Sequence, residues 1–148
     1  MNFLKLFLDY AAAFESTVLD DDWERIKPFF SQDAVYEVGA GKFGARLVGP
    51  DAICAGIRKS LGGFDRRFAS RRPELLGKPE TLADGCRIEW NAHYQQEGFE
   101  PLVLRGASTV RYREGKIVYL ADHYDAAAEA NLLAWQSRNA LPVDLSYV

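Results

Sequence analysis

The sequence of 148 residues contains only two cysteines and two histidines, which limits the chemistry that it can support. Cys54 and Cys86 fall on different predicted elements and lack the paired spacing of a zinc or redox motif. We therefore expect reduced thiols that are packed in the interior. His93 and His123 have no acidic partner at metal-ligand spacing, so the sequence predicts no metal site.

Long apolar runs and phosphate-binding glycine motifs are also missing. The apolar stretch at residues 1–8 is interrupted by a lysine, is too short to span a membrane and lacks a small-residue cleavage site. Gly39, Gly41 and Gly44 do not have the spacing that cradles a phosphate ahead of a helix. We therefore expect a cytoplasmic protein that uses no cofactor and does not bind a membrane.

An excess of positive charge is absent as well, because the net charge is −3. Binding of nucleic acid needs a basic surface, so this balance argues against a nucleic-acid partner. We expect the densest basic group to be a solvated strand end, as such groups usually are. That group consists of Arg66, Arg67, Arg71 and Arg72, with Asp65 and Glu74 beside it.

What the sequence does contain fits one globular domain over residues 1–148. A chain of this size buries roughly 68–70% of its unfolded surface, which is enough for one core without metals or disulfides. The aromatic share of 13% suits a core or a pocket with large, flat walls.

Helical patterns dominate the N-terminal part of the chain. Residues 3–14 place four aromatic rings at helical spacing. Asp21 and Glu24 form a capping-box pattern, which predicts a second, short helix that Pro28 closes. A third helix is expected from the Gly-Pro-Asp start at residues 49–51, and it ends at a glycine pair.

Strand patterns follow, and a last helix is expected over residues 126–139. Residues 87–94 alternate strongly, with Trp90 and Tyr94 on the apolar face. Helices followed by such strands predict an α+β fold, in which a curved antiparallel sheet wraps around the N-terminal helices and one central pocket. The other expected strands are 34–38, 102–112 and 116–124, and residues 39–49 are expected to form a loop.

The hairpin at residues 113–115 decides which side chains face the interior. A three-residue loop places Ser108, Leu120, Asp122 and Tyr124 on the more apolar face, which should line the pocket. A carboxylate among apolar neighbours ionises with difficulty, so Asp122 is a candidate functional group, although it can equally be a structural acceptor. A two-residue loop would instead swap the faces and bury His123.

Three motifs together resemble the nuclear transport factor two-like superfamily, a cone-shaped α+β fold that includes ketosteroid isomerases and SnoaL-like polyketide cyclases. The motifs begin with Asp22-Trp23 and the run from Phe29 to Tyr36, continue with the helix start at residues 49–53, and end with residues 114–117 and 122–125. The resemblance spans roughly residues 5 to 126, and it implies the fold rather than one function.

Ketosteroid isomerase activity is excluded when the resemblance is followed residue by residue. The hydroxyl donor of the first helix falls at Phe14, and the proton-shuttling acid falls at Val38. The second acid of the oxyanion site falls near Ser108. Without a base beside the α-carbon of the substrate, that proton transfer has no mechanism.

Two other branches of the superfamily fit better. The resemblance to SnoaL-like cyclases implies that Asp122 is the base on the final strand. Limonene-epoxide-hydrolase-like enzymes would match Tyr36 and an Arg87/Glu89 pair, but Val38 replaces their asparagine. The alternation of residues 87–94 points Trp90 inward, so an exposed cross-strand ion pair is the expected role of Arg87 and Glu89.

The sequence thus favours a cofactor-independent enzyme of cyclase, isomerase or hydrolase type that acts on a small, mostly apolar molecule. Asp122 would be the base, and Tyr36 and Tyr124 would donate hydrogen bonds. The alternatives are a non-catalytic ligand-binding module and a homodimeric assembly module that pairs through the outer sheet face. The expected pocket residues are Phe14, Val38, Trp90, Tyr94, Ser108 and Leu120.

Overall fold

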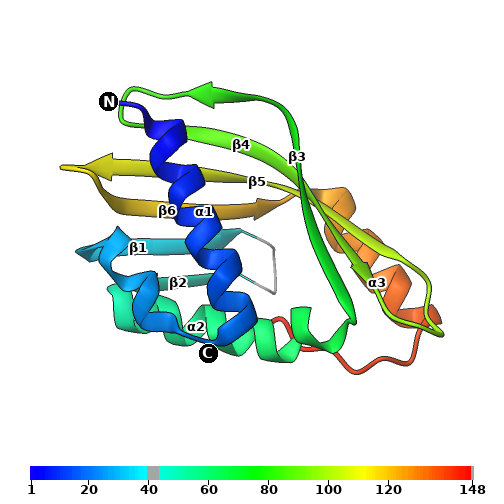
Figure 1. The fold of residues 1–148 in the computed structure, drawn as a ribbon. Helices are drawn as coiled ribbons and strands as arrows, with labels where there is room; N and C mark the ends of the chain where they lie inside the picture. Colours follow the sequence, from blue (N-terminus) through cyan, green and yellow to red (C-terminus); the bar gives the residue numbers. More distant parts are fainter. Residues whose placement is uncertain (40–43, 148) are drawn as a thin grey trace.

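The computed structural model describes residues 1–39 and 44–147, and it has the expected α+β class. Over these described residues, three α-helices, three 3-10 helices (η) and six strands follow one another (Figure 1). Their bounds are α1 Phe3–Asp20, η1 Trp23–Arg25, η2 Lys27–Phe29, β1 Phe30–Gly39, β2 Ala45–Val48, α2 Pro50–Gly63, η4 Asp65–Arg67, β3 Ser70–Thr81, β4 Gly85–Gln95, β5 Leu102–Arg113, β6 Lys116–Tyr124 and α3 Ala126–Arg138.

The six strands form one curved sheet in the order β2-β1-β6-β5-β4-β3. The sheet is mixed rather than wholly antiparallel, because β1 pairs with β6 in parallel, with Val38 beside Asp122. A tight hairpin forces neighbouring strands to run antiparallel, whereas β1 and β6 are joined through α2 and four strands and are free of that constraint. The other four strand pairings are antiparallel.

Two segments near the first strand differ from the sequence prediction. Asp21 does not cap a second α-helix; it ends α1 in a left-handed conformation with φ of 62°, and two short 3-10 helices follow. Its carboxylate accepts a hydrogen bond from Nε1 of Trp23 at 2.6 Å instead. The expected loop 39–49 contains β2, and residues 40–43 of that loop lie outside the described residues.

The helices cover the concave face and one edge of the sheet. In Figure 1, α1 (blue) crosses in front of the strands, and α2 (green) runs below β2. Asn2 caps α1 by accepting a hydrogen bond from the Lys5 amide at 3.0 Å. Within the described residues, no helix is both long enough and apolar enough to cross a membrane. The buried residues of α2, which include Ile53, Ile57 and Leu61, follow helical spacing, so one face of this helix packs on the core.

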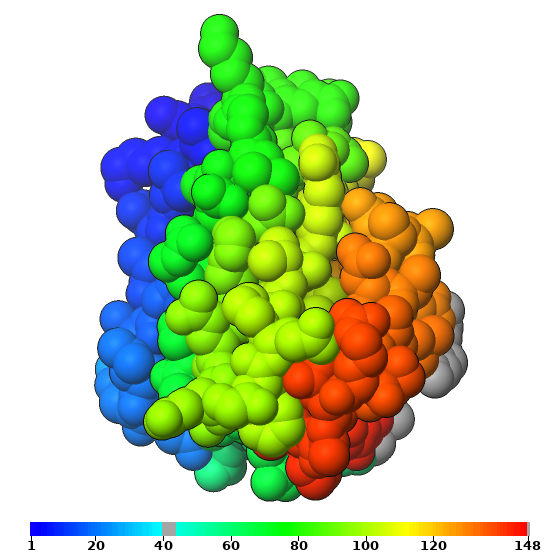
Figure 2. Space-filling model, turned by 90° about the vertical axis from the view of Figure 1, so that its right-hand side faces the viewer, coloured from blue at the N-terminus to red at the C-terminus, as the bar shows by residue number. Residues whose placement is uncertain are grey.

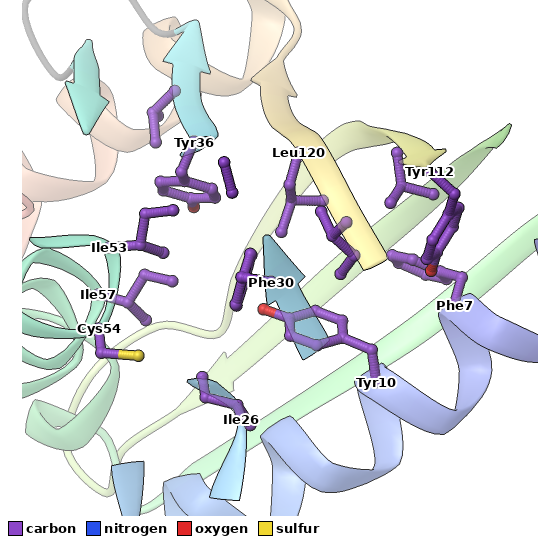
Figure 3. Packing of buried hydrophobic residues seen from close by; sticks show 14 of the residues in the cluster. Phe7, Tyr10, Ile26, Phe30, Tyr36, Ile53, Cys54, Ile57, Tyr112 and Leu120 are labelled. Atoms are coloured by element: carbon purple, nitrogen blue, oxygen red, sulfur yellow. The ribbon is translucent and has the colours of Figure 1, made fainter. Parts of the chain in front are cut away.

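The main core lies between α1, α2 and the first strand. Tyr10 of α1 points at Phe30 of β1, and their rings meet edge to face at 5.5 Å (Figure 3). Ile53 and Ile57 of α2 approach the same space from the other side (Figure 3). Both cysteines are free and buried, as the sequence predicts, and burial raises the pKa of Cys54 to about 11.

A second core cluster closes the other end of the sheet. Figure 2 shows α3 (orange to red) lying beside β5 (yellow-green), and Trp135 of α3 is buried there with Phe64 and Phe68. The segment after α3 returns to α2, where the Asp144 amide donates to the Gly63 carbonyl oxygen at 2.9 Å. This return places Tyr147 against the ring of Tyr36, with the ring centroids 5.9 Å apart.

The hairpin between β5 and β6 has a shorter loop than predicted. Arg113 pairs with Lys116, so only Glu114 and Gly115 lie between the strands. Their φ values of 52° and 76° are both left-handed, as in the type I′ turn whose twist matches that of the strands. A two-residue loop alone would have turned the opposite faces of the strands inward.

A bulge in β6 restores the predicted faces. The register shifts after the pair of Tyr112 with Ile117, and Val118 is the extra residue. Beyond the bulge Ser108 lies directly opposite Asp122, and both side chains face the interior. Ile117, which precedes the bulge, is fully buried in the main core.

The left-handed conformation of Glu114 predicts a stabilising substitution. Asparagine tolerates positive φ better than glutamate and is the preferred first residue of a type I′ turn. Glu114→Asn should therefore raise the free energy of unfolding by about 0.5 kcal/mol. This is a fraction of the roughly 1–2 kcal/mol that a left-handed backbone conformation costs a residue with a Cβ atom. Urea unfolding measures it, with Glu97→Asn, in an exposed turn without positive φ, as the matched control. An equal gain in both variants would contradict the explanation.

Candidate active site

A cavity of about 410 Å³ opens between α1 and the concave face of the sheet. Its wall is mostly apolar and aromatic, with polar side chains in two separate groups. Eight of the nine residues predicted from the sequence line it: Phe14, Tyr36, Trp90, Tyr94, Ser108, Leu120, Asp122 and Tyr124. The ninth, Val38, is buried in the main core and does not contribute to the wall.

Asp122 is held by two hydroxyl groups, one on each carboxylate oxygen. Tyr36 of β1 donates to Oδ2 at 2.6 Å, and Ser108 of β5 donates to Oδ1 at 2.6 Å. The indole Nε1 of Trp90 in turn donates to Oγ of Ser108 at 2.9 Å, which fixes the direction of the serine hydroxyl. Three strands thus fix the orientation of one carboxylate inside the cavity.

The environment of Asp122 favours the protonated acid. Burial raises the pKa of this carboxyl, and the hydrogen bonds from Ser108 and Tyr36 oppose the rise only in part. A carboxyl whose pKa moves up toward neutrality is a stronger base than an ordinary aspartate when it is ionised. A carboxyl in this environment can exchange a proton with a molecule in the cavity.

The phenols around Asp122 stay protonated at neutral pH. Burial is the largest cause that raises the pKa of Tyr36 and of Tyr124, and the charge of Asp122 adds to it. Among the described residues, the hydroxyl of Tyr124 makes no hydrogen bond, while its ring meets that of Trp90 edge to face at 5.5 Å. Tyr124 can therefore donate a hydrogen bond to a ligand, whereas the Tyr36 hydroxyl is already engaged.

The position of Trp90 depends on a glycine in the neighbouring strand. Gly106 lies opposite Trp90, and a Cβ atom there would come within 2.7 Å of the indole Cη2 and 2.6 Å of the His123 carbonyl oxygen. Only glycine leaves this space free, so the indole can lie across β5 and reach Ser108. The sequence contained this signal, since Gly106 interrupts an otherwise apolar strand face.

A second polar group lines the cavity, and the sequence prediction for it was wrong. Arg71 was expected in a solvated cluster, but its side chain is 19% exposed and contributes to the cavity wall. Its Nε donates to Oδ2 of Asp65 at 2.8 Å, and its Nη1 donates to both carboxylate oxygens of Glu15, at 3.0 and 2.8 Å. Tyr94 also donates to Oδ2 of Asp65, at 3.2 Å.

Four further cavity residues were missed because nothing in their sequence surroundings marks them. Tyr10 follows the core pattern of α1, and Tyr147 follows a segment without periodicity. Leu75 is 53% exposed in β3, and Leu8 is 42% exposed in α1, yet both line the cavity. The cavity therefore opens to solvent between α1 and β3, past two exposed leucines.

The residues expected on the outer sheet face are there. Arg87 and Glu89 are about half exposed and 3.7 Å apart, but this ion pair lies within β4 rather than across two strands as predicted. Glu89 also approaches Arg105 of the neighbouring strand β5 at 3.8 Å. His93 contacts Glu74 at 3.1 Å, and His123 is exposed. In the part of the chain that the structure describes, no group of three or more His, Cys, Asp or Glu side chains could hold a metal ion.

Solved structures with this fold share little sequence with the chain. A putative SnoaL-like polyketide cyclase from Shewanella putrefaciens is 7% identical, with 94% of this chain and 88% of that one covered at a TM-score of 0.69. A protein of ketosteroid-isomerase-like fold from Catenulispora acidiphila, in complex with trimethylamine, is 17% identical over 86% and 92% (TM-score 0.63). An epoxide hydrolase from M. tuberculosis, similar to limonene epoxide hydrolase, is 14% identical over 91% and 98% (TM-score 0.59).

A search of curated proteins found no match. The model of the SnoaL-like domain family matches residues 8–120, which include most of α1, every residue of the second polar group, β1 to β5 and the first part of β6. The solved structures agree with this match in fold. The chain therefore belongs to the SnoaL-like domain family and has the nuclear transport factor two-like fold that its sequence motifs resemble.

Proposed function

We propose that this protein is a cofactor-independent enzyme that uses Asp122 as a general base on a small, mostly apolar molecule. The observation that carries the proposal is the buried carboxylate of Asp122, held by hydroxyl groups on both oxygens inside an aromatic cavity. A buried acid costs stability, and a perturbed carboxyl in a cleft is a candidate for acid–base chemistry.

The reaction needs only proton transfers. Asp122 takes a proton from the carbon beside a carbonyl group and returns it to another atom, so the enzyme is unchanged at the end. Tyr36 and Ser108 fix the carboxylate, and each oxygen keeps a lone pair for the proton. Tyr124 donates a hydrogen bond to the oxygen that becomes negative, which lowers the energy of the transition state.

The comparisons support this class of chemistry without naming the reaction. The proteins of similar fold include a putative polyketide cyclase and an epoxide hydrolase. Epoxide hydrolysis fits this chain less well, because Arg87 and Glu89 form their ion pair on the outer face and Val38 lies in the core. A cyclase-like or isomerase-like proton transfer is therefore the form that we propose.

Loss of the base should abolish turnover. Asp122→Asn should reduce conversion of a mixed panel of epoxides, enones and polyketide-like esters by about 10²–10⁴-fold, the usual contribution of a general base. The matched control is the carboxylate–phenol pair on the outer face, where Tyr119 donates to Glu37 at 2.8 Å. Glu37→Gln should leave conversion unchanged. Equal turnover by the wild type and Asp122→Asn would refute the proposal. If the wild type and both variants bind a compound but none of them converts it, a non-catalytic binding module would be favoured.

The raised pKa of Asp122 also predicts a pH-dependent stability. Because the pKa is higher in the folded than in the unfolded state, the folded protein loses stability as the pH rises through the folded pKa. Asp122→Asn should therefore be more stable than the wild type at pH 8, and the gain should vanish near about pH 3, where both states are protonated. Urea unfolding across this range measures the difference.

The control for that measurement is a carboxyl with the opposite shift. Ser31 and Arg113 lower the pKa of Asp33, so its ionised form stabilises the folded state. Asp33→Asn should consequently lose stability at pH 8 rather than gain it. A less stable Asp122→Asn at pH 8 would mean that the ionised carboxylate contributes to the fold, contrary to the proposal.

We also propose that the protein forms a homodimer through the outer sheet face. That face carries Arg105, Thr109, Arg111 and Tyr119, and its ion pairs are only partly buried in the single chain. Sedimentation should give twice the chain mass for the wild type and the chain mass for Thr109→Arg. Thr81→Arg, at an exposed position of the edge strand β3, should remain a dimer. A monomeric wild type at high concentration would exclude this assembly.

A further inference from the structure

The two polar groups of the cavity are separated along the sheet. Trp90, which belongs to the Asp122 group, lies four residues before Tyr94 in β4, or about 13 Å along the strand at the usual rise per residue. Arg71 of β3 lies directly opposite Tyr94 in the strand pairing. A ligand that reaches Asp122 with one end can therefore meet the second group with the other.

The second polar group carries a net negative charge. Arg71 contacts two carboxylates, Asp65 and Glu15, so three charged groups sum to −1 when all are ionised. Both acids lie within range of one guanidinium, and Asp65 is 13% exposed. Since no further cation lines the described cavity wall, an anionic ligand group would be repelled here.

The same group still has unused hydrogen-bonding capacity. Within the described residues, no hydrogen bond uses Nη2 of Arg71, and the bonds that Asp65 accepts from Arg71 and Tyr94 both fall on Oδ2. Nη2 is a donor, and Oδ1 of Asp65 is an acceptor. A neutral hydroxyl can satisfy both at once, because it accepts one hydrogen bond and donates another.

We propose that Glu15, Asp65, Arg71 and Tyr94 form a subsite that binds an uncharged hydroxyl group, alcoholic or phenolic, at the end of the substrate remote from Asp122. An apolar group in its place would leave buried donors and acceptors unpaired, and a carboxylate would face excess negative charge. The subsite rests on the proposed function, since it specifies the substrate of that same cavity, but its test uses binding alone.

Three rigid probes test the subsite by calorimetry at pH 8: 4-hydroxybiphenyl, 4,4′-dihydroxybiphenyl and 4′-hydroxybiphenyl-4-carboxylate. The wild type should bind the dihydroxy compound about 5–10-fold more tightly than the monohydroxy one, the usual effect of one net hydrogen bond. It should bind the carboxylate more weakly than either. The pH is set above neutrality because burial raises the pKa of Asp65, although Arg71 and Tyr94 oppose the rise.

A double substitution should reverse the preference. Glu15→Gln with Asp65→Asn changes the charge of the subsite from −1 to +1, so the carboxylate probe should bind more tightly than the dihydroxy probe. Glu80→Gln with Asp84→Asn removes two charges from the protein surface instead and should leave the wild-type order unchanged. A folded double variant that keeps the wild-type order would overturn the proposal.

Asp122→Asn separates this proposal from the proposed function. The second hydroxyl should improve binding to this variant as much as to the wild type, because the subsite does not include the base. If the improvement disappears, the hydroxyl binds at Asp122 and the subsite is wrong. A folded wild type that binds none of the probes, or that binds the carboxylate as tightly as the dihydroxy compound, would also overturn it.

Discussion

The side chain of Asp122 faces the interior because β6 carries one more residue than β5 over their paired length. The type I′ turn at Glu114-Gly115 and the bulge at Val118 have opposite effects on the register, and together they leave Ser108 opposite Asp122. Every other contact of the carboxylate follows from that register. Without the bulge, the exposed imidazole of His123 would take its place, and Tyr36 would lose its acceptor.

Much of the fold was predictable, because its elements have strong local patterns. The aromatic spacing of α1, the Gly-Pro start of α2 and the alternation of β4 each depend on neighbouring residues alone. The inward face of β5 and β6 was predicted correctly, but from an incorrect loop length that the bulge compensates. The parallel pairing of β1 with β6 has no local signal, since it joins residues more than eighty positions apart.

The candidate site was predictable only where a residue lies on a regular strand face. Asp122, Ser108, Trp90 and Tyr94 follow from alternation. Arg71 and Asp65 do not, because a charged residue among charged neighbours is usually solvated, and only the packing of α1 against β3 buries this pair. Tyr147 is placed by the return of the chain to α2, which depends on contacts with Gly63 and Ser60 rather than on any pattern of its own.

The indole of Trp90 is a fluorophore that lies in the cavity wall. Its N–H donates to Ser108, Ser108 donates to Asp122, and its ring touches Tyr124. The other two tryptophans do not line the described cavity wall: Trp23 donates to Asp21, and Trp135 donates to the Glu100 carbonyl oxygen. The emission of Trp90 should therefore respond both to the protonation of Asp122 and to a molecule bound in the cavity, without an added dye.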